Sequence, residues 1–152
     1  MTQAKCFIAI NELSLVRQGT LEVAELRVTS PLVAVNAVRS YLANAYRENV
    51  VVLGLDAEAN MIGISTAGQG GIDHCLIRPR HIYDRAYRMN AVGIVVAHNH
   101  TNGKPGPSSD DLKFMRKLIA LGAELDCPLR DFIITGDGTD KYWSARNETY
   151  EV

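Results

Sequence analysis

The sequence contains only three cysteines, at positions 6, 75 and 127, and no C-x-x-C pair. This scattered, odd-numbered set argues against a disulfide framework and a thiolate zinc cluster, and it fits a reducing compartment. No apolar run approaches the roughly 20 residues that span a bilayer. The opening residues, MTQAKCFIAINELS, have the features of neither a signal peptide nor a transit peptide. The sequence therefore predicts a cytoplasmic protein with no membrane contact.

The sequence also lacks an excess of charge of either sign. Its 16 basic and 17 acidic residues give a formal net charge of −1, and no basic run exceeds two residues. Nonspecific nucleic-acid binding depends mainly on neutralising phosphates. This balance therefore argues against a strong duplex binder, although it leaves room for a small local patch. The arginines between positions 78 and 88 alternate with apolar groups, which is typical of a solvated face.

No repeat, low-complexity tract or linker-like stretch divides the chain, so residues 1–152 predict one domain. A chain of this length buries roughly 70% of the surface that its unfolded form exposes, which is enough for a core without disulfides. Apolar residues make up 47% of the sequence. That share is ordinary for a globular protein.

Stretches rich in apolar and β-branched residues predict the strands. Two of them flank the polar turn Asp56–Asn60, which indicates a hairpin. Val92–Ala97 is unbroken apolar, which is typical of a strand covered on both faces. The expected strands are two within residues 4–28, then 51–55, 61–65, 92–97, 131–135 and a short one at 141–145.

Capping residues and apolar spacing predict three helices. Ser30-Pro31 begins the first helix, because a hydroxyl cap followed by proline suits a first turn. Its expected apolar face consists of Leu32, Val35, Val38, Leu42 and Tyr46. The second helix covers residues 82–89 and stops at Asn90, and the third covers residues 108–125. These elements predict an α/β protein, arranged as an α+β sandwich around one mixed sheet.

The segment His98-Asn99-His100 follows the apolar run directly. Residues i and i+2 of a strand point to the same face, so both imidazoles are expected on one side, with Asn99 turned away. Asp111 falls on the first turn of the next helix, where it can face the strand end. Two histidines and one carboxylate leave a fourth tetrahedral position open for water, which is the pattern of a catalytic zinc site.

The order and spacing of these residues resemble a known motif. His98 and His100 are followed after seven residues by Ser108, and after two more by Asp111. This arrangement is similar to the JAMM motif of the JAB1/MPN metalloprotease superfamily. The strings AHNHTNGKPGPSSDDL and GAELDCPLRDFIITGDG, together with RENVVVLGLD upstream, resemble the RadC branch in particular. The resemblance covers about residues 30–140.

The resemblance implies a single JAB1/MPN-like domain with a cytidine-deaminase-like mixed sheet, flanked by about three helices. Within it, His98, His100 and Asp111 would hold one zinc ion. Glu48 would act as the general acid/base, and Ser108 would donate a hydrogen bond to the tetrahedral oxyanion. The substrate that the family suggests is an amide bond, peptide or isopeptide, in a protein or peptide partner.

The chain departs from the family's usual string at two places. Thr101-Asn102 stands where Pro-Ser is usual, and Phe132 stands where a histidine usually follows the aspartate. Neither departure is expected to touch the metal ligands. The chain also leaves no room for the helix-hairpin-helix region at the N-terminus of longer RadC proteins. A DNA role tied to that region is therefore not expected.

Residue spacing alone leaves several alternatives open. The Ser108-x-x-Asp111 pattern is also a helix capping box, and Glu58 ties with Glu48 as the acid/base. A non-catalytic MPN-like scaffold would keep the fold without turnover, and RadC proteins are traditionally labelled as DNA-repair factors. A zinc deaminase is disfavoured, because the sequence lacks the H-x-E and P-C-x-x-C patterns of that class. The sequence does not predict an oligomeric state.

Overall fold

The computed structural model describes residues 6–70 and 77–152. In chain order its elements are α1 (Pro31–Tyr41), β1 (Asn49–Leu55), β2 (Met61–Gln69), α2 (Pro79–Arg88), β3 (Gly93–His100), α3 (Ser109–Glu124), β4 (Leu129–Gly136) and β5 (Tyr142–Ser144). The strands form one sheet in the order β2-β1-β3-β4-β5. Only β3 and β4 pair in parallel, so the sheet is mixed and the predicted α/β class is confirmed.

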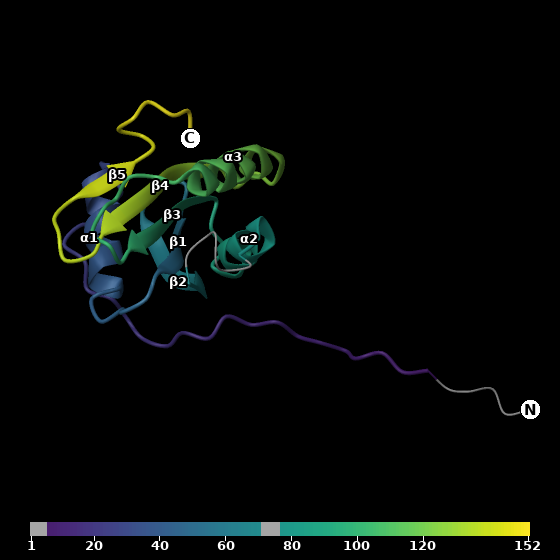
Figure 1. Cartoon of the computed structure of the whole chain (residues 1–152). Helices are drawn as coiled ribbons and strands as arrows, with labels where there is room; N and C mark the ends of the chain where they lie inside the picture. The colour runs from purple at the N-terminus through teal and green to yellow at the C-terminus, as the bar shows by residue number, and fades with distance from the viewer. Residues whose placement is uncertain (1–5, 71–76) are drawn as a thin grey trace, which may run out of the picture.

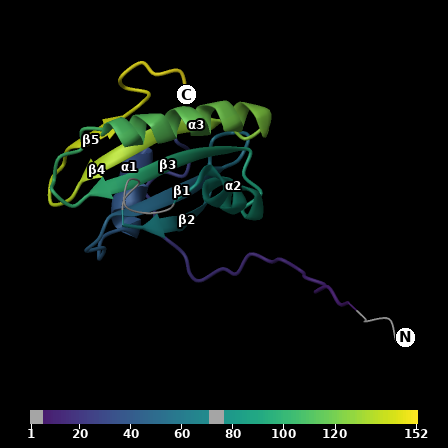
Figure 2. The ribbon, with the colours of Figure 1, turned by 45° about the vertical axis from the view of Figure 1, so that its right-hand side comes forward.

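The helices cover both faces of this sheet. Figure 1 and Figure 2 show α1 on one face and α2 with α3 on the other. Apolar side chains pack in two clusters, one beneath α1 and one beneath α2 and α3, and β1, β3 and β4 contribute to both. The central strands are therefore fixed from both sides, and so are the residues at their ends. Among the described residues, no helix combines the length and the apolar character needed to cross a membrane.

Several predicted elements are confirmed. The hairpin of β1 and β2 closes around the turn at residues 56–60, although β2 continues to Gln69. The second helix ends before Asn90, whose φ of 58° is the expected left-handed stop. The third helix begins after Ser108 as its N-cap. The buried runs form β3 and β4, and the tail adds β5.

The predicted apolar face of the first helix is wrong at both ends. Leu32 is 47% exposed, and Tyr46 lies beyond the helix with 83% of its surface exposed. The side chains that α1 buries against the sheet are instead small: Val33, Ala34, Val35, Ala37 and Val38. A helix continuing to Tyr46 would leave only two residues before β1 begins at Asn49. The reversal of the chain therefore limits the length of the helix.

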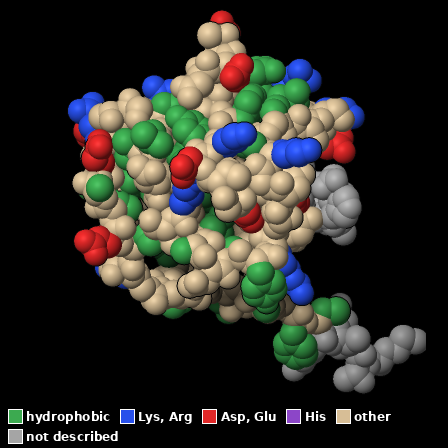
Figure 3. Space-filling model, turned by 60° about the vertical axis from the view of Figure 1, so that its left-hand side comes forward, with side chains coloured by type: hydrophobic (Ala, Val, Ile, Leu, Met, Phe, Trp, Pro, Cys, Tyr) green, Lys and Arg blue, Asp and Glu red, His purple; other side chains and the backbone are tan. Residues whose placement is uncertain are grey.

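The two strands predicted within residues 4–28 are wrong over the part that the structure describes. Residues 6–26 are extended chain without a strand, and the first pairing is a single bridge between Arg27 and Asn60. Phe7 is 86% exposed and Ile10 is fully exposed. We call residues 6–26 the N-terminal arm. Figure 3 shows hydrophobic side chains of this arm at the lower right, away from the rest of the protein. The segment has the composition of a strand, but a strand also needs a neighbour to bond with.

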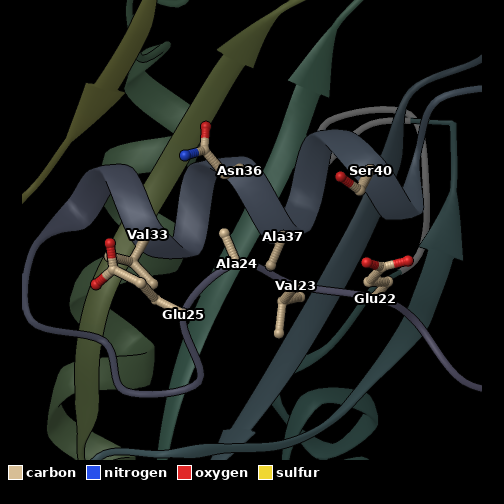
Figure 4. Close-up of a pocket in the computed structure, with 8 residues that line it drawn as sticks. All are labelled: Glu22, Val23, Ala24, Glu25, Val33, Asn36, Ala37 and Ser40. Atoms are coloured by element: carbon tan, nitrogen blue, oxygen red, sulfur yellow. The ribbon is translucent and has the colours of Figure 1, made fainter.

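The end of this arm lies beside α1. Figure 4 shows residues 22–25 running along the helix, with the side chain of Ala37 pointing from the helix toward this segment. This segment and α1 together line a partly open hollow of about 150 Å³. Its lining residues are Glu22, Val23, Ala24, Glu25, Val33, Asn36, Ala37 and Ser40. Because α1 covers one face of the sheet, the hollow belongs to that face.

Candidate metal centre

The two predicted histidine ligands lie at the carboxyl end of β3. His98 is 1% exposed and His100 is half-buried, and their ring centroids are 4.7 Å apart with an interplanar angle of 70°. Both follow Val96 at steps of two, so they share its face of the sheet, the face beneath α2 and α3. Asn99 belongs to the opposite face, as alternation predicts.

The carboxylate arrives from the first turn of α3. Asp111 is 3% exposed, and its Oδ1 lies 3.1 Å from His98 Nε2. Its Oδ2 lies 3.6 Å from His100 Nε2. Ser108 caps the helix reciprocally: Asp111 N donates to Ser108 Oγ at 3.1 Å, while Ser108 N and Oγ each donate to Asp111 Oδ2 at 2.7 Å. The capping box is therefore present and orients the carboxylate.

The dimensions of this cluster suit a metal ion. The nearest ligand atoms of His98, His100 and Asp111 all lie within 4.8 Å of one another. Tetrahedral nitrogen and oxygen ligands at 2.0–2.1 Å from zinc are roughly 3.3 Å apart. The separation of His98 Nε2 from Asp111 Oδ1, 3.1 Å, and that of His100 Nε2 from Asp111 Oδ2, 3.6 Å, bracket that value. The three residues can therefore hold a metal ion of this size.

The hydrogen bonding of His98 supports the same interpretation. Both of its ring nitrogens are buried, and neither makes a well-aligned hydrogen bond among the residues that the structure describes, although Nε2 lies 3.1 Å from Asp111 Oδ1. An unpaired buried polar atom costs about 1–3 kcal/mol, so most such atoms in proteins are satisfied. A cation between His98 and Asp111 would satisfy Nε2.

The titratable groups of the cluster influence one another. Burial alone would raise the pKa of Asp111, but its polar contacts with His100 and His98 outweigh burial and hold that pKa far below its usual range. Contact with Asp111 raises the pKa of His100, against the opposing effect of burial. Asp111 is therefore ionised, and its charge favours the protonated form of His100. A metal ion would replace that proton.

The loop between β3 and α3 orients His100. His100 Nδ1 lies 2.7 Å from the carbonyl oxygen of Lys104, and a carbonyl can only accept, so Nδ1 carries the hydrogen. Nε2 is then free to bind a cation. Lys104 N in turn donates to Asn102 Oδ1 at 2.9 Å. Lys104 was not predicted as a site residue, because a backbone carbonyl that orients a ligand leaves no signature in residue type.

The two departures from the family's string are closer to the ligands than expected. The ring of Phe132 packs edge-on against His98, with centroids 5.9 Å apart, so that expectation is wrong for Phe132. The cause is the parallel register, in which Phe132 lies opposite Val96 on the same face, one step along from His98. Asn102 acts on His100 indirectly, through Lys104.

The two candidate acid/base residues lie at opposite ends of β1. Glu48 directly precedes the strand and is half-buried, and its charge adds to the effects that raise the pKa of His100. Glu58 is exposed in the hairpin turn, where its backbone N–H donates to Asp56. The seven residues of β1 separate the two glutamates by roughly 20 Å at about 3.3 Å per residue. Of the two, only Glu48 lies at the end of β1 that pairs with β3 at His98.

Comparison with known proteins gives a matching family. Residues 28–150 match the model of the RadC-like JAB domain. The chain is 32% identical over 123 residues to a UPF0758 protein of Clostridium acetobutylicum, covering 81% of this chain and 53% of that protein. It is 39% identical over 102 residues to a UPF0758 protein of Thermotoga maritima, covering 67% of this chain and 45% of that protein.

A UPF0758 protein of Alkaliphilus oremlandii matches more of the chain at lower identity. It is 28% identical over 146 residues, which cover 96% of this chain and 62% of that protein. The chain thus spans about half the length of the curated relatives that it matches. The names of these relatives state no activity.

Proposed function

The chain belongs to the RadC-like JAB domain family, and from that premise we propose that it is a zinc-dependent hydrolase of amide bonds. His98, His100 and Asp111 are the proposed zinc ligands. The observation that carries the proposal is His98, a buried imidazole that makes no well-aligned hydrogen bond among the described residues, with its Nε2 3.1 Å from the ionised carboxylate of Asp111. The proposed partner is a protein or peptide that contains a peptide or isopeptide bond.

Zinc bound by these residues would supply a Lewis acid that polarises the substrate carbonyl and lowers the pKa of a water molecule. Glu48 takes a proton from water as the oxygen adds to the carbonyl carbon. It then returns that proton to the leaving nitrogen as the C–N bond breaks, so the products are a carboxylic acid and an amine. The half-buried position of Glu48 near His100 supports this role.

Ser108 is the proposed donor to the oxyanion that forms in the same step. It is exposed at the N-terminus of α3, where backbone N–H groups and the helix dipole also favour negative charge. In the free protein its hydroxyl donates to Asp111 Oδ2. Donation to substrate therefore requires the hydroxyl to rotate away from Asp111.

The test begins with metal content. Purified protein is expected to contain about one zinc ion per chain by elemental analysis, and His98→Ala is expected to lose it. His81→Ala is the matched control, because His81 accepts a hydrogen bond from Arg78 N at the start of α2 and has no part in the cluster. The apo protein is expected to stay folded, since both core clusters are independent of the metal ligands.

Activity is then measured on a peptide library and on isopeptide-linked substrates. We expect cleavage that chelation abolishes and added zinc restores. A folded wild-type protein that takes up no zinc would overturn the metal site. One zinc per chain without cleavage of any amide substrate would instead favour the non-catalytic scaffold.

A further inference from the structure

Asn99 lies between the two histidines but points to the other face of the sheet. It is 1% exposed. A buried amide is costly unless its donors and acceptor are satisfied, so its partners are informative. All of them lie in segments that border the candidate metal centre.

The amide of Asn99 bonds to the backbone on both sides of Glu48. Asn49 N donates to Asn99 Oδ1 at 2.7 Å, and Asn99 Nδ2 donates to the carbonyl oxygen of Arg47 at 3.1 Å. The remaining N–H donates to Asp137 Oδ2 at 2.8 Å. Because a carboxylate only accepts, Asp137 fixes which end of the amide is nitrogen.

These bonds begin where the pairing of β1 with β3 ends. The last paired residues are Val50 and His98. The next residue of β1 bonds to the side chain of Asn99 instead of to the backbone of β3. On the other side, Gly70 N donates to the carbonyl oxygen of Glu48 at 2.7 Å. Residues 47–49, the Glu48 segment, are thus hydrogen-bonded on one side to Asn99 of β3 and on the other to Gly70, which follows β2.

We propose that Asn99 is a positioning residue, which fixes the Glu48 segment to the strand that carries both histidine ligands. This inference rests on the proposed function, because it assigns Asn99 a role in placing the acid/base. A shift of about 1 Å in a catalytic group can cost on the order of 10²-fold in rate. Asn99 lies between the two histidine ligands in the sequence, so its hydrogen bonds fix the position of Glu48 relative to the metal centre.

The first test uses Asn99→Ala and does not depend on activity. Loss of the amide removes the acceptor of Asn49 N, so hydrogen exchange at that amide is expected to accelerate while zinc content stays at about one per chain. Thr135→Val is the matched control. Thr135 lies directly opposite Asn99 on β4 and is also buried, and its substitution leaves the bonds to residues 47 and 49 in place.

The second test separates positioning from a general structural effect. Asn99→Ala is expected to lower kcat by on the order of 10²-fold with little change in KM, whereas Thr135→Val keeps wild-type kcat. In a Glu48→Gln background the same Asn99→Ala substitution should cause no further loss, because the group that it positions is already inactive. An undiminished loss in that background would overturn the positioning role.

The outcomes distinguish the two proposals. If the wild-type protein hydrolyses amides but Asn99→Ala keeps both its kcat and the protection of the Asn49 amide, the role of Asn99 is refuted and the proposed function stands. If the wild-type protein shows no zinc-dependent hydrolysis, the proposed function fails, and with it the role of Asn99 in positioning Glu48 for that reaction. Faster hydrogen exchange at the Asn49 amide in Asn99→Ala would then still show that Asn99 fixes the Glu48 segment to β3.

Discussion

The two ends of β1 carry similar hydrogen-bond networks, which differ in the sequence separation of the residues that they link. At the turn end, Asp56 accepts hydrogen bonds from Glu58 N, Asn60 N and Asn60 Nδ2 at 2.8–2.9 Å. At the other end, the Asn99 amide joins Asn49, Arg47 and Asp137. The turn network links residues at most four apart in the sequence, whereas Asn99 and Asn49 are 50 apart.

This difference separates what stabilises the strand from what assembles the site. A network within one turn forms with the turn itself, because aspartate readily bonds to the backbone two residues ahead. A network across 50 residues exists only after β1 and β3 have paired. Residues of the candidate site therefore depend on the whole sheet, and substitutions at the two ends are expected to affect different properties.

Replacing the glutamate at each end of β1 by glutamine is expected to give the largest difference in activity. Glu48→Gln keeps the shape of the side chain but cannot take a proton, so hydrolysis is expected to fall by roughly 10²–10⁴-fold. Zinc content should not change, since Glu48 is not one of the clustered ligands. Initial rates and elemental analysis on the same preparation check both statements.

Glu58→Gln is the matched control at the turn end. Its side chain is exposed and lies roughly 20 Å along the strand from the metal end, at about 3.3 Å per residue. We expect it to keep wild-type activity. Full activity of Glu48→Gln together with an inactive Glu58→Gln would reverse the assignment.

Ser108 gives a smaller effect that has two separable parts. As the cap of α3, its replacement in Ser108→Ala should cost about 1 kcal/mol of unfolding free energy. As an oxyanion donor, its loss should lower kcat by on the order of 10²-fold. Denaturant unfolding measures the first part, and kinetics well below the unfolding temperature measure the second.

Ser108→Asp separates the two roles further. A carboxylate can cap a helix and is favoured at its N-terminus, but it cannot donate to an oxyanion and repels it. This variant is expected to be folded, zinc-loaded and inactive. If both Ser108 variants retain activity, Ser108 serves only as a cap.

The sequence was informative wherever a pattern is local. The unbroken apolar run predicted β3, the alternation of side chains predicted the shared face of His98 and His100, and the Ser108-x-x-Asp111 spacing predicted the start of α3. These features follow from chain geometry over a few residues. The convergence of the three ligand side chains is largely a consequence of one short loop between β3 and α3.

Features that depend on distant partners were not predicted. Residues 7–16 are as apolar as many strands, yet they lie extended without a neighbouring strand, because sequence pattern does not specify an available edge. The contact of Phe132 with His98 depends on the parallel register of β3 and β4. The role inferred for Asn99 depends on where the pairing of β1 with β3 stops.

The smallest expected effect is at the turn end, where Asp56→Ala should lower the melting temperature by a few degrees and leave kcat unchanged. Hydrogen bonds from Asn60 hold the pKa of Asp56 below its ordinary value of 3.8. A carboxyl group whose pKa is lower in the folded state stabilises the protein fully above the unfolded value, and that contribution is lost as the pH falls through the folded value. The melting-temperature difference between wild type and Asp56→Ala should therefore be constant near neutral pH and shrink below pH 3.8.

Asp56→Asn, which keeps an acceptor oxygen without the charge, should lose less stability. A loss of activity in Asp56→Ala at temperatures where it is folded would contradict the separation of the two ends of β1.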